Sequence, residues 1–428
     1  MAKITKIWGR EILDSRAVPT VEVICQTDSG HVAVSSVPAG ASTSTHEALE
    51  LRDKDEKRYL GKGVLTAVNN VNTIISDGLA GMDPADQAAI DSKLLELDGT
   101  KNKSKLGANA TLAVSEVVAK VAAFSKGIPL YKWILELSKT VGIKVDHLKM
   151  ATPIFNMING GLHGAGNLDF QEFHVIPSTS KKFSEGLLAG AEIYKTIGLN
   201  LQRRGAIHSV GDEGGYAPNL FANADALQVI VESIQETNYR LGRDVLLGLD
   251  VAASVFFEND SYIIKDRSSP MKEADMLEYY KNLNDQYKLA ILEDPFHEDS
   301  WQSWKNLYTA LSNEVLIVGD DLLATSVDRV QKAIAEKACN AILVKPNQVG
   351  TVSETLKVVK MSKDAGWKIV VSHRSGETND EFIADFAIGV GADYVKFGAP
   401  ARGERVAKYN RLSVIETELL YEASLSQR

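Results

Sequence analysis

Six short apolar runs in the last two-thirds of the chain each lead to a residue of a type that works in catalysis. The residues at these ends are Asp250, Glu293, Asp320, Lys345, His373 and Lys396. Successive ends lie 43, 27, 25, 28 and 23 residues apart, which fits one strand plus one crossover helix each time. Because ligands of parallel α/β folds bind at the carboxyl ends of the strands, we expect these side chains to share one site.

A charged residue at the end of one buried strand is common, because solvent begins there. Six such ends in succession, changing from acids to lysines along the chain, need a shared cause. Three acids, two lysines and the pair His373-Arg374 at one rim would suit a hard cation and an anionic substrate.

The three acids of this set favour a metal site. Asp250, Glu293 and Asp320 end three consecutive predicted strands, so their carboxylates can converge. Three oxygen anions without a nearby thiolate select a hard ion, and Mg²⁺ fits best. Asp250 alone could instead cap the helix that follows it, but capping does not explain all three acids.

Lys345 and Lys396 lie further along the same predicted rim, close to the expected metal. Nearby cations disfavour a protonated lysine and lower its pKa, so either residue could act as a base near neutral pH. Either could instead bind a phosphate as a point charge. A lysine beside carboxylate-bound Mg²⁺ indicates removal of a proton next to a substrate carboxylate, because the resulting enolate needs concentrated positive charge.

Two further carboxylates are candidates for a general acid. Glu213 follows Asp212 between the glycines of GDEGGYAP, and Glu172 lies in the strand-like segment QEF. Two carboxylates in a partly buried site raise the pKa of one another, which leaves one able to donate a proton. The alternative for GDEGG is a simple acidic turn.

Two other segments offer groups for a phosphate. His163 lies in the glycine-rich NGGLHGAGN, and SHRSGE places Arg374 and Ser375 just past a predicted strand. Arginine presents a planar fork to phosphate, and a serine with backbone N–H groups can complete the cradle. A lone histidine in a loop is usually structural, so His163 gains interest only from these partners.

The elements that must position these residues fall into two predicted domains. VPTVEVICQT, a turn at DSG and HVAVSSVP predict a hairpin, and a small-residue loop then leads into a helix that Thr43 or Ser44 could cap. A helical pattern runs from residue 63 to about 126. We therefore expect an α+β N-terminal capping domain over residues 1–138 and a (β/α)8 barrel that carries the site over residues 139–428.

Composition excludes several function classes. Among 428 residues the formal net charge is −9 with a pI near 5.5, which argues against a nucleic-acid partner. No apolar run is long enough for a transmembrane span or a signal peptide, so no membrane partner and a cytoplasmic location are expected. Dinucleotide-binding, P-loop, zincin and serine-elbow motifs are absent. Cys25 and Cys339 fit buried reduced thiols better than a disulfide or a metal site.

Together the motifs resemble the enolase family. The segments that carry the resemblance run from about residue 6 to residue 420 and are SRxxPTVEV, VPAGAST, HEALELRD, NGGLHGAGN, QEF, GDEGGYAP, LEDPF, GDDL, VKPNQVGT, SHRSGET and GAPARGER. The resemblance implies an α/β fold, an enolase-type (β/α)8 barrel behind a small α+β domain, with irregular first strands. It also implies a pair of subunits, so a homodimer or higher homo-oligomer is expected.

The resemblance implies Mg²⁺-dependent interconversion of 2-phosphoglycerate and phosphoenolpyruvate, with two Mg²⁺ ions per site. Lys345 would remove the C2 proton, and Glu213, assisted by Glu172, would help the C3 hydroxyl leave. Lys396 would stabilise the intermediate. The resemblance also implies the residues that bind metal, which are Asp250, Glu293, Asp320 and the Ala39 carbonyl. The residues that it implies around the substrate are His163, Gln171, Glu172, Glu293, Asp320, His373, Arg374, Ser375 and Ser42.

Several positions depart from the pattern of the family. Ala39 stands where a serine usually supplies both a carbonyl and a hydroxyl to the second Mg²⁺, and Ser44 replaces a glycine that would ease hinge motion. Ala17-Val18 replaces Gly-Asn, and Phe397 replaces a small polar residue. An enzyme that dehydrates a phosphonate or another analogue of 2-phosphoglycerate, and a non-catalytic scaffold, are the alternatives. The scaffold is disfavoured because no acid, base or first-metal ligand is lost.

Overall fold

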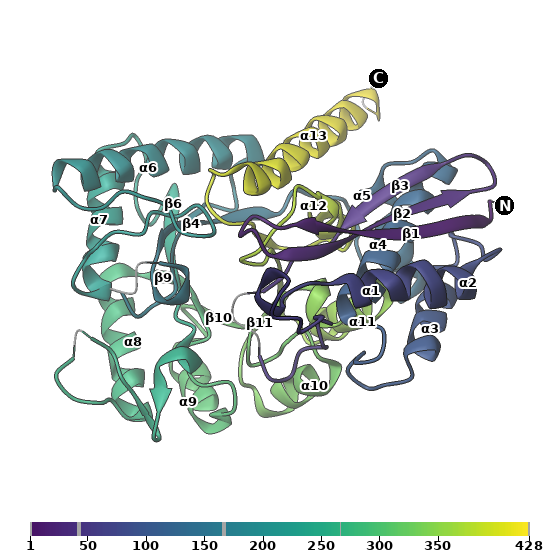
Figure 1. Ribbon diagram of the computed structural model, residues 1–428. Coiled ribbons are helices and arrows are strands. Elements are labelled where there is room, and N and C mark those ends of the chain that lie inside the picture. The colour runs from purple at the N-terminus through teal and green to yellow at the C-terminus, as the bar shows by residue number, and fades with distance from the viewer. Residues whose placement is uncertain (1, 41–43, 165–167, 266, 427–428) are drawn as a thin grey trace.

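The chain forms a closed eight-stranded barrel with a smaller α+β unit packed against it (Figure 1). The computed structural model describes residues 2–40, 44–164, 168–265 and 267–426. In Figure 1 a three-stranded sheet and its helices lie to the right, while helices α6 to α9 flank the barrel to the left. The predicted fold class, an enolase-type barrel behind an α+β domain, is confirmed.

The N-terminal unit is a three-stranded antiparallel sheet covered by helices. Its strands are β1 (Ile4–Leu13), β2 (Pro19–Thr27) and β3 (Val32–Ser36). The β2–β3 hairpin was expected from the alternating pattern, whereas β1 was not. The helices are α1 (Leu65–Asn70), α2 (Ser76–Leu79), α3 (Gln87–Asp98), α4 (Ala108–Lys126) and α5 (Leu130–Thr140), with η1 (Tyr59–Gly61) and the π-turn η2 (Val71–Ile75) between them.

Helix α4 forms the core of this unit because its apolar residues face the sheet. Leu112, Val114, Val117, Val118 and Val121 are all fully buried, as the sequence predicts. They pack with inward-facing residues of β2 in one hydrophobic cluster.

The prediction of a helix after Ser44 is wrong, because residues 44–58 contain only turns and irregular chain. The backbone of this segment bonds to distant parts of the chain instead. Leu49 N–H donates to the carbonyl of Asn102 at 2.8 Å. The Asp53 carboxylate accepts the N–H groups of Leu65 and Thr66 at 2.8 Å, which satisfies the first turn of α1. Tertiary hydrogen bonds therefore override the local helical pattern.

The barrel closes in the order β10-β11-β12-β13-β4-β5-β6-β9. All neighbouring pairs are parallel except β4–β5 and β5–β6, so the six predicted strands are parallel and the irregularity lies in the first two. The strands are β4 (Thr152–Asn159), β5 (Glu172–Pro177), β6 (Val245–Asp250), β9 (Leu289–Glu293), β10 (Leu316–Gly319), β11 (Ala341–Val344), β12 (Lys368–Ser372) and β13 (Tyr394–Lys396).

Helices surround the barrel as its outer layer. They are α6 (Phe183–Arg203), α7 (Asn223–Gln235), α8 (Glu273–Tyr287), α9 (Trp301–Leu311), α10 (Val327–Glu336), α11 (Val352–Asp364), α12 (Phe382–Gly389) and α13 (Gly403–Ser426). Short pieces are η3 (Gly161–His163), η4 (Ala253–Phe256), η5 (Pro346–Gln348) and the ribbon β7 (Phe257–Glu258) with β8 (Ser261–Tyr262). Helix α5 crosses residue 138 and lies against α12, so the exact domain boundary stays a prediction.

The interior of the barrel is an apolar plug below the carboxyl ends of the strands. One buried cluster fills it with Ile154, Ile176, Ile291, Val318, Ala341, Leu343 and Val370. No helix among the described residues is long and apolar enough to span a membrane. Both cysteines are buried free thiols.

Candidate active site

The six residues predicted at strand ends all lie at the carboxyl rim of the barrel. Asp250, Glu293 and Lys396 are the last residues of β6, β9 and β13, and the other three follow β10, β11 and β12 directly. All but Lys345 are buried. The prediction from residue spacing that these six residues lie at one rim is therefore confirmed.

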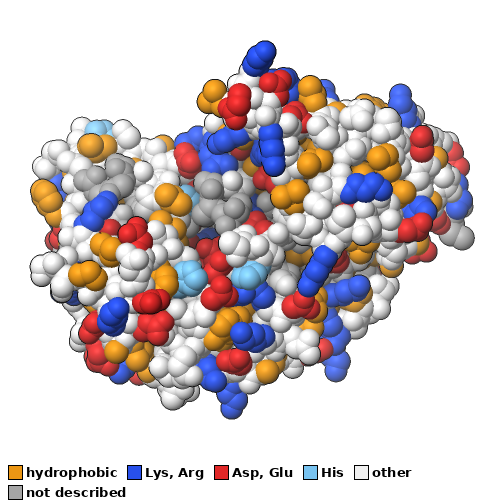
Figure 2. Space-filling view, turned by 60° about the horizontal axis from the view of Figure 1, so that its bottom comes forward, with side chains coloured by type: hydrophobic (Ala, Val, Ile, Leu, Met, Phe, Trp, Pro, Cys, Tyr) orange, Lys and Arg blue, Asp and Glu red, His pale blue; other side chains and the backbone are white. Residues whose placement is uncertain are grey.

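A small cavity at this rim gathers most of the predicted site. Its lining residues are His163, Gln171, Glu172, Glu213, Asp250, Asp320, Lys345, Ser372, His373, Arg374, Ser375 and Lys396. In the space-filling view, acidic, basic and histidine side chains collect near the middle of the face (Figure 2). A wider depression lined by Phe257, His297 and Trp301 lies elsewhere.

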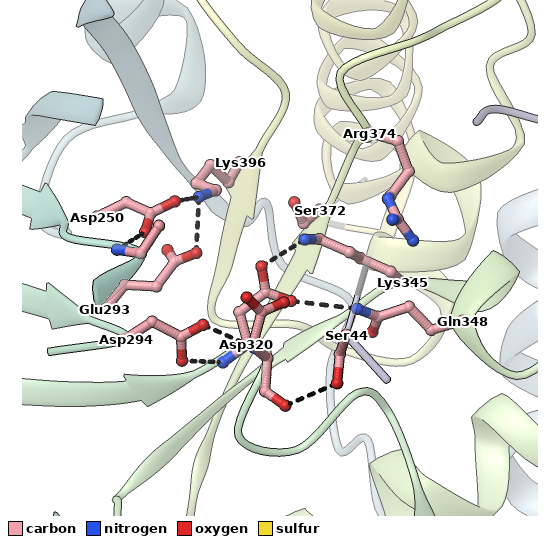
Figure 3. Close-up of polar contacts among 12 residues, drawn as sticks. Ser44, Asp250, Glu293, Asp294, Asp320, Lys345, Gln348, Ser372, Arg374 and Lys396 are labelled. Atoms are coloured by element: carbon pink, nitrogen blue, oxygen red, sulfur yellow. Dashed lines mark hydrogen bonds and ion pairs between the residues drawn. The ribbon is translucent and has the colours of Figure 1, made fainter. Parts of the chain in front are cut away.

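Lys396 lies among three carboxylates, and Figure 3 shows its contacts with two of them, Asp250 and Glu293. Its Nζ is 2.8 Å from Glu293 Oε1 and 3.0 Å from Asp250 Oδ2, with Glu172 Oε1 at 3.5 Å. Burial opposes the charge, but these acids outweigh it and raise the pKa of Lys396 well above its usual value. Lys396 is therefore held as a cation.

Lys345 is paired with Asp320, and its expected low pKa is wrong in this structure. Burial lowers the pKa of Lys345, but the charge of Asp320 and their hydrogen bond outweigh burial and raise it. The positive neighbours Arg374 and Lys396 act in the expected direction but are weaker than the contact carboxylate. Gln348 Nε2 approaches the other oxygen of Asp320 at 3.3 Å.

The acids of the rim fit a cation in number and type. Burial and the charges of Asp250 and Asp320 raise the pKa of Glu293 well above its usual value, because like charges repel one another. A divalent ion would relieve this repulsion with the oxygen ligands that hard ions prefer. Lys396 and Lys345 now neutralise these acids, so a cation would share them with the two ammonium groups.

Asp294 and Asp321 extend this acidic group and were not predicted. Within the described ranges, ligand atoms of Asp294, Asp320 and Asp321 lie within 4.8 Å of one another. Asp294 accepts the N–H groups of Asp320 and Asp321 at 2.9 and 2.7 Å, so it fixes the loop after β10. Burial and neighbouring acids raise the pKa of Asp321 to about 7.

The second group of titratable residues is Glu172, Glu213, His163 and His373. His163 Nδ1 lies 3.5 Å from Glu213 Oε1 and 3.6 Å from Glu172 Oε1, and His373 Nε2 is 3.4 Å from Glu213 Oε2. Burial lowers the pKa of His163, but the charges of both glutamates outweigh burial and raise it.

The two glutamates do not show the raised pKa that the sequence analysis expects. Burial and Glu172 raise the pKa of Glu213, but His163 and His373 outweigh them and bring it to about 2. Burial likewise raises the pKa of Glu172, and Lys396 with two histidines brings it well below its usual value. Both glutamates therefore favour the ionised form.

Asn156 on β4 contacts this group and was missed. Its Nδ2 donates to Glu213 Oε2 at 3.0 Å, and the residue is fully buried. A Cβ at Gly215 would lie only 2.6 Å from Asn159 Oδ1 and 2.8 Å from Asn156 Oδ1, so glycine lets the GDEGG loop approach β4 closely. The two asparagines of the segment NMING were the sequence signal that could have pointed to these contacts.

The predicted phosphate arginine is held by a glutamate from the N-terminal unit. Arg374 Nη1 donates to Glu47 Oε2 at 2.9 Å and to Asn347 Oδ1 at 3.1 Å, and Nη2 approaches Glu47 Oε1 at 3.3 Å. Ser375 lines the cavity beside it. Gln171, expected to support Glu172, directs its amide toward Asp250 Oδ2 at 3.5 Å.

Arg405 organises the loop after β12 and had no predicted role. It is fully buried and donates to His373 Nδ1 and the Arg374 carbonyl at 2.6 Å, and to the carbonyls of Ser375 and Asp212 at 2.7 and 3.0 Å. Because Nδ1 accepts from Arg405, a neutral His373 presents Nε2–H to Glu213. Arg405 lies in the motif GAPARGER, but nothing in that motif indicates the partners of Arg405.

Ala39 is buried beside the cavity. Its N–H donates to Gly376 O at 2.8 Å, and its carbonyl accepts from Gly376 N–H at 2.9 Å and Arg16 Nη2 at 3.2 Å. The carbonyl thus has two donors already, and its role as a metal ligand stays a prediction. Ser42 lies outside the described residues.

The other departures have clear structural settings. Ala17 adopts a left-handed φ of 58°, where the usual glycine has no steric penalty. Phe397 is fully buried against Tyr409, with 6.1 Å between ring centroids. Ser44 Oγ donates to Glu298 Oε2 at 2.5 Å.

The fold is a closed barrel beside an α+β unit. The carboxyl rim of the barrel gathers lysines, paired carboxylates and a candidate cation site. Together these features define a barrel enzyme of the lyase type. Residues 4–134 match the family model described as the enolase N-terminal domain, and residues 147–427 match that described as the enolase C-terminal TIM barrel domain. The chain belongs to the enolase family.

Proposed function

We propose that this enzyme catalyses the Mg²⁺-dependent, reversible dehydration of 2-phospho-D-glycerate to phosphoenolpyruvate. The observation that carries this proposal is the convergence of two lysines, four carboxylates and Arg374 on one small cavity. Each charge that the reaction requires has a counterpart there: a base for C2, an acid for C3, and cations for the carboxylate and the phosphate.

Lys345 is the proposed base. Its Nζ lines the cavity at the end of β11 and is paired with Asp320. Once that carboxylate is shared with another cation, the ammonium can release its proton to solvent, and the neutral amine then accepts the C2 proton. Lys396 stays protonated among its acids and stabilises the negative charge that develops on the substrate carboxylate.

Glu213 and Glu172 lie on the other side of the cavity, as departure of the C3 hydroxyl requires. Glu213, whose pKa lies at about 2, first takes a proton from His163 and then delivers it to the leaving hydroxyl. His163, whose pKa is raised, keeps that proton within the cluster. Asn156 and His373 hold the Glu213 carboxylate in place.

Asp250, Glu293 and Asp320 would hold the first Mg²⁺, and Ala39 would contribute to a second, substrate-dependent ion. Bound Mg²⁺ would neutralise the substrate carboxylate and so acidify the C2 proton. Arg374 with Ser375 would take the phosphate, and His163, Gln171, His373 and Ser42 would line the substrate.

The proposal is tested by following phosphoenolpyruvate formation from 2-phosphoglycerate with and without Mg²⁺. Turnover should require Mg²⁺. Asp320→Asn should fold yet lose turnover and bind Mg²⁺ more weakly by calorimetry. Unchanged Mg²⁺ binding in that variant would remove Asp320 from the ligand set.

The altered residues Ala39 and Ser44 keep a second candidate open, the dehydration of a phosphonate or another analogue of 2-phosphoglycerate. Assaying that analogue beside 2-phosphoglycerate separates the two, because the true substrate will have the higher kcat/KM. Absence of turnover on both would favour a scaffold role.

We also propose that the protein acts as a cytoplasmic homodimer or higher homo-oligomer without nucleic-acid or membrane partners. Leu13, Val32 and Val34 are about half exposed on the three-stranded sheet, which supports contact with another copy. Analytical ultracentrifugation will measure the mass in solution, and a monomer would contradict this assignment.

A further inference from the structure

His174 is a buried imidazole that the proposed reaction does not use. It lies on β5 two residues after Glu172, is fully buried, and its Nε2 is 2.9 Å from Glu172 Oε2. Its other nitrogen, Nδ1, has no hydrogen-bond partner within the described residues. In the part of the chain that the structure describes, the only hydrogen-bond partner of this side chain is therefore a carboxylate of the candidate active site.

The position of His174 is unusual for the interior of this barrel. Strand alternation places it on the inward face with Glu172 and Ile176, one layer below the cavity. Its cross-strand neighbours are Asn156 on β4 and Gly248 on β6. A Cβ at Gly248 would lie 3.0 Å from Ile176 Cδ1, 3.2 Å from Ile291 Cβ and 3.4 Å from His174 Nδ1, so glycine prevents crowding in the layer that holds the imidazole.

The two oxygens of Glu172 therefore have different partners. Oε2 points down to His174, whereas Oε1 lies 3.5 Å from Lys396 Nζ and 3.6 Å from His163 Nδ1 at the cavity. A buried carboxylate oxygen without a donor is strongly unfavourable, so loss of His174 would turn or displace this carboxylate. The acceptor also fixes the tautomer, because a neutral imidazole that donates through Nε2 leaves Nδ1 unprotonated.

We propose that His174 is a positioning residue: its Nε2–H group holds one oxygen of Glu172 below the cavity and thereby aims the other at His163 and Lys396. Glu172 is then faced by His174 from β5, His163 from the loop after β4, Lys396 from β13 and the carboxylate of Glu213. The effect on catalysis rests on the proposed function, whereas the contact itself does not.

The contact is tested first without substrate or metal. Protein labelled with ¹⁵N in its histidines should show His174 as the Nε2-protonated tautomer, with a proton resonance that exchanges slowly with water. His174→Gln assigns the resonance by deleting it. In Glu172→Gln the proton should move upfield, because a neutral amide is a weaker acceptor. An Nδ1-protonated His174, or a resonance unaffected by Glu172→Gln, would overturn the proposal.

The consequence is tested with two substitutions on 2-phosphoglycerate. His174→Leu keeps a similar volume but removes the donor, and His174→Gln retains an N–H donor near the position of Nε2. We expect His174→Leu to lower kcat about ten- to a hundredfold with a smaller change in KM, and His174→Gln to recover most of the loss.

The decisive readout is the ratio of C2-proton exchange to phosphoenolpyruvate formation. Glu172 assists the later loss of hydroxide, so this ratio should rise in His174→Leu and return toward the wild-type value in His174→Gln. General damage to the fold would reduce both reactions together. An unchanged ratio, or equal activity of the two variants, would refute a positioning role.

Asn200 provides the matched control. It is buried, and its Nδ2 donates to Ser233 Oγ at 2.8 Å between α6 and α7, far from the cavity lining. Asn200→Leu should lower thermal stability like His174→Leu but leave kcat within about twofold. If the wild type forms no phosphoenolpyruvate, the proposed function fails, while the resonance of His174 still decides the contact.

Discussion

Each lysine of the cavity is held by carboxylates from other strands of the barrel, and this pairing sets what a substitution will do. Lys345 contacts Asp320, whereas Lys396 contacts three acids. Removing either lysine leaves buried carboxylates without their counter-ion, so loss of activity alone would not assign a role. A test of the base has to separate the two halves of the reaction.

Exchange of the C2 proton with solvent provides that separation. Lys345→Ala should abolish exchange as well as product formation, because no base remains. Glu213→Gln should retain some exchange while product formation falls about a hundredfold or more, because it blocks only the later step. Exchange is measured by ²H incorporation into recovered 2-phosphoglycerate. A Lys345→Ala protein that exchanges like wild type would refute the base assignment.

Ala39 allows a test of the second metal ion. A serine at this position would offer the hydroxyl that the present side chain lacks, so Ala39→Ser should lower the Mg²⁺ concentration needed for half-maximal turnover about fivefold. Mg²⁺ binding without substrate should not change, because Asp250, Glu293 and Asp320 come from the barrel. Identical Mg²⁺ dependence in the variant would show that the side chain is not a missing ligand.

Ala17 gives a prediction about stability. Its φ of 58° is strained for any residue with a Cβ, and the side chain is exposed, so little packing is lost on its removal. Ala17→Gly should raise the free energy of unfolding by about 1 kcal/mol in denaturant titrations.

The same substitution at Ala88 is the control. Ala88 is exposed in the regular helix α3, where glycine should destabilise by about 0.5–1 kcal/mol. Opposite signs at the two positions would assign the effect to backbone strain. A destabilised Ala17→Gly protein would contradict that account.

At the scale of elements, the sequence predicts what depends on periodicity and misses what depends on distant partners. Strand ends such as Asp250 and Lys396 are set by apolar runs, so their place in the barrel follows from the chain alone. Strand β1 was missed although it pairs with the next strand, β2. The helix expected after Ser44 is absent because the hydrogen bonds of that segment go to partners far along the chain.

The roles of side chains below and behind the site were equally invisible. Asn156, His174 and Arg405 carry no motif of their own, and their contacts arise only when three strands and a C-terminal helix come together. The pKa expectations for Lys345 and Glu213 failed for the same reason, because the nearest partner could not be known from spacing.

The segment after residue 43 is anchored by Glu298, a nearly buried residue of the loop after β9. Its Oε2 accepts from Ser44 Oγ at 2.5 Å and its Oε1 from Thr45 Oγ1 at 3.0 Å. A glycine at position 44 could not make the first bond. Ser44 therefore has less backbone freedom than a glycine would have, but its side chain makes a contact with Glu298 that a glycine could not make.

A double-mutant cycle measures this anchor. Ser44→Ala, Glu298→Ala and the double variant should give a coupling free energy of about 1–2 kcal/mol, since one partner is charged and both are buried. The exposed hydroxyl pair Ser178 and Ser180, 2.9 Å apart, is the control and should couple by less than about 0.5 kcal/mol. Equal coupling in the two pairs would show that Ser44 is not an anchor.

At the scale of the whole molecule, the site depends on the contact between the N-terminal unit and the barrel. Glu47 holds Arg374 across this contact, and Lys120 of α4 pairs with Asp380 of the loop before α12 at 2.6 Å. The barrel alone would therefore lack the partner that orients its proposed phosphate ligand.

One buried acid at this contact, Glu116, makes stability depend on pH. Ser35 Oγ lies 2.9 Å from Glu116 Oε2 and 3.2 Å from Asp380 Oδ2, yet a hydroxyl has one hydrogen to donate. Asp380 also accepts from the Ser36 N–H at 2.9 Å and from Lys120 Nζ at 2.6 Å. Ser35 can serve both carboxylates only if Glu116 is protonated and donates to Ser35, which then donates to Asp380. Burial, with the charge of Asp380, raises the pKa of Glu116 well above its usual value, in agreement with this chain of hydrogen bonds.

The sign of the pH effect follows from linkage. Between the unfolded pKa of a glutamate, about 4.5, and the raised folded pKa, the folded state binds more protons, so stability falls as the pH rises. Glu116→Gln keeps the shape and supplies a permanent donor to Ser35. The free energy of unfolding of this variant should match that of the wild type near pH 4 and exceed it by about 1 kcal/mol or more at pH 8.

Glu116→Ala should instead be less stable at both pH values, because it leaves a cavity and an unpaired Ser35. Denaturant titrations across this range measure the difference, and parallel curves for wild type and Glu116→Gln would mean that Glu116 is ionised in the folded protein and that Ser35 donates to it.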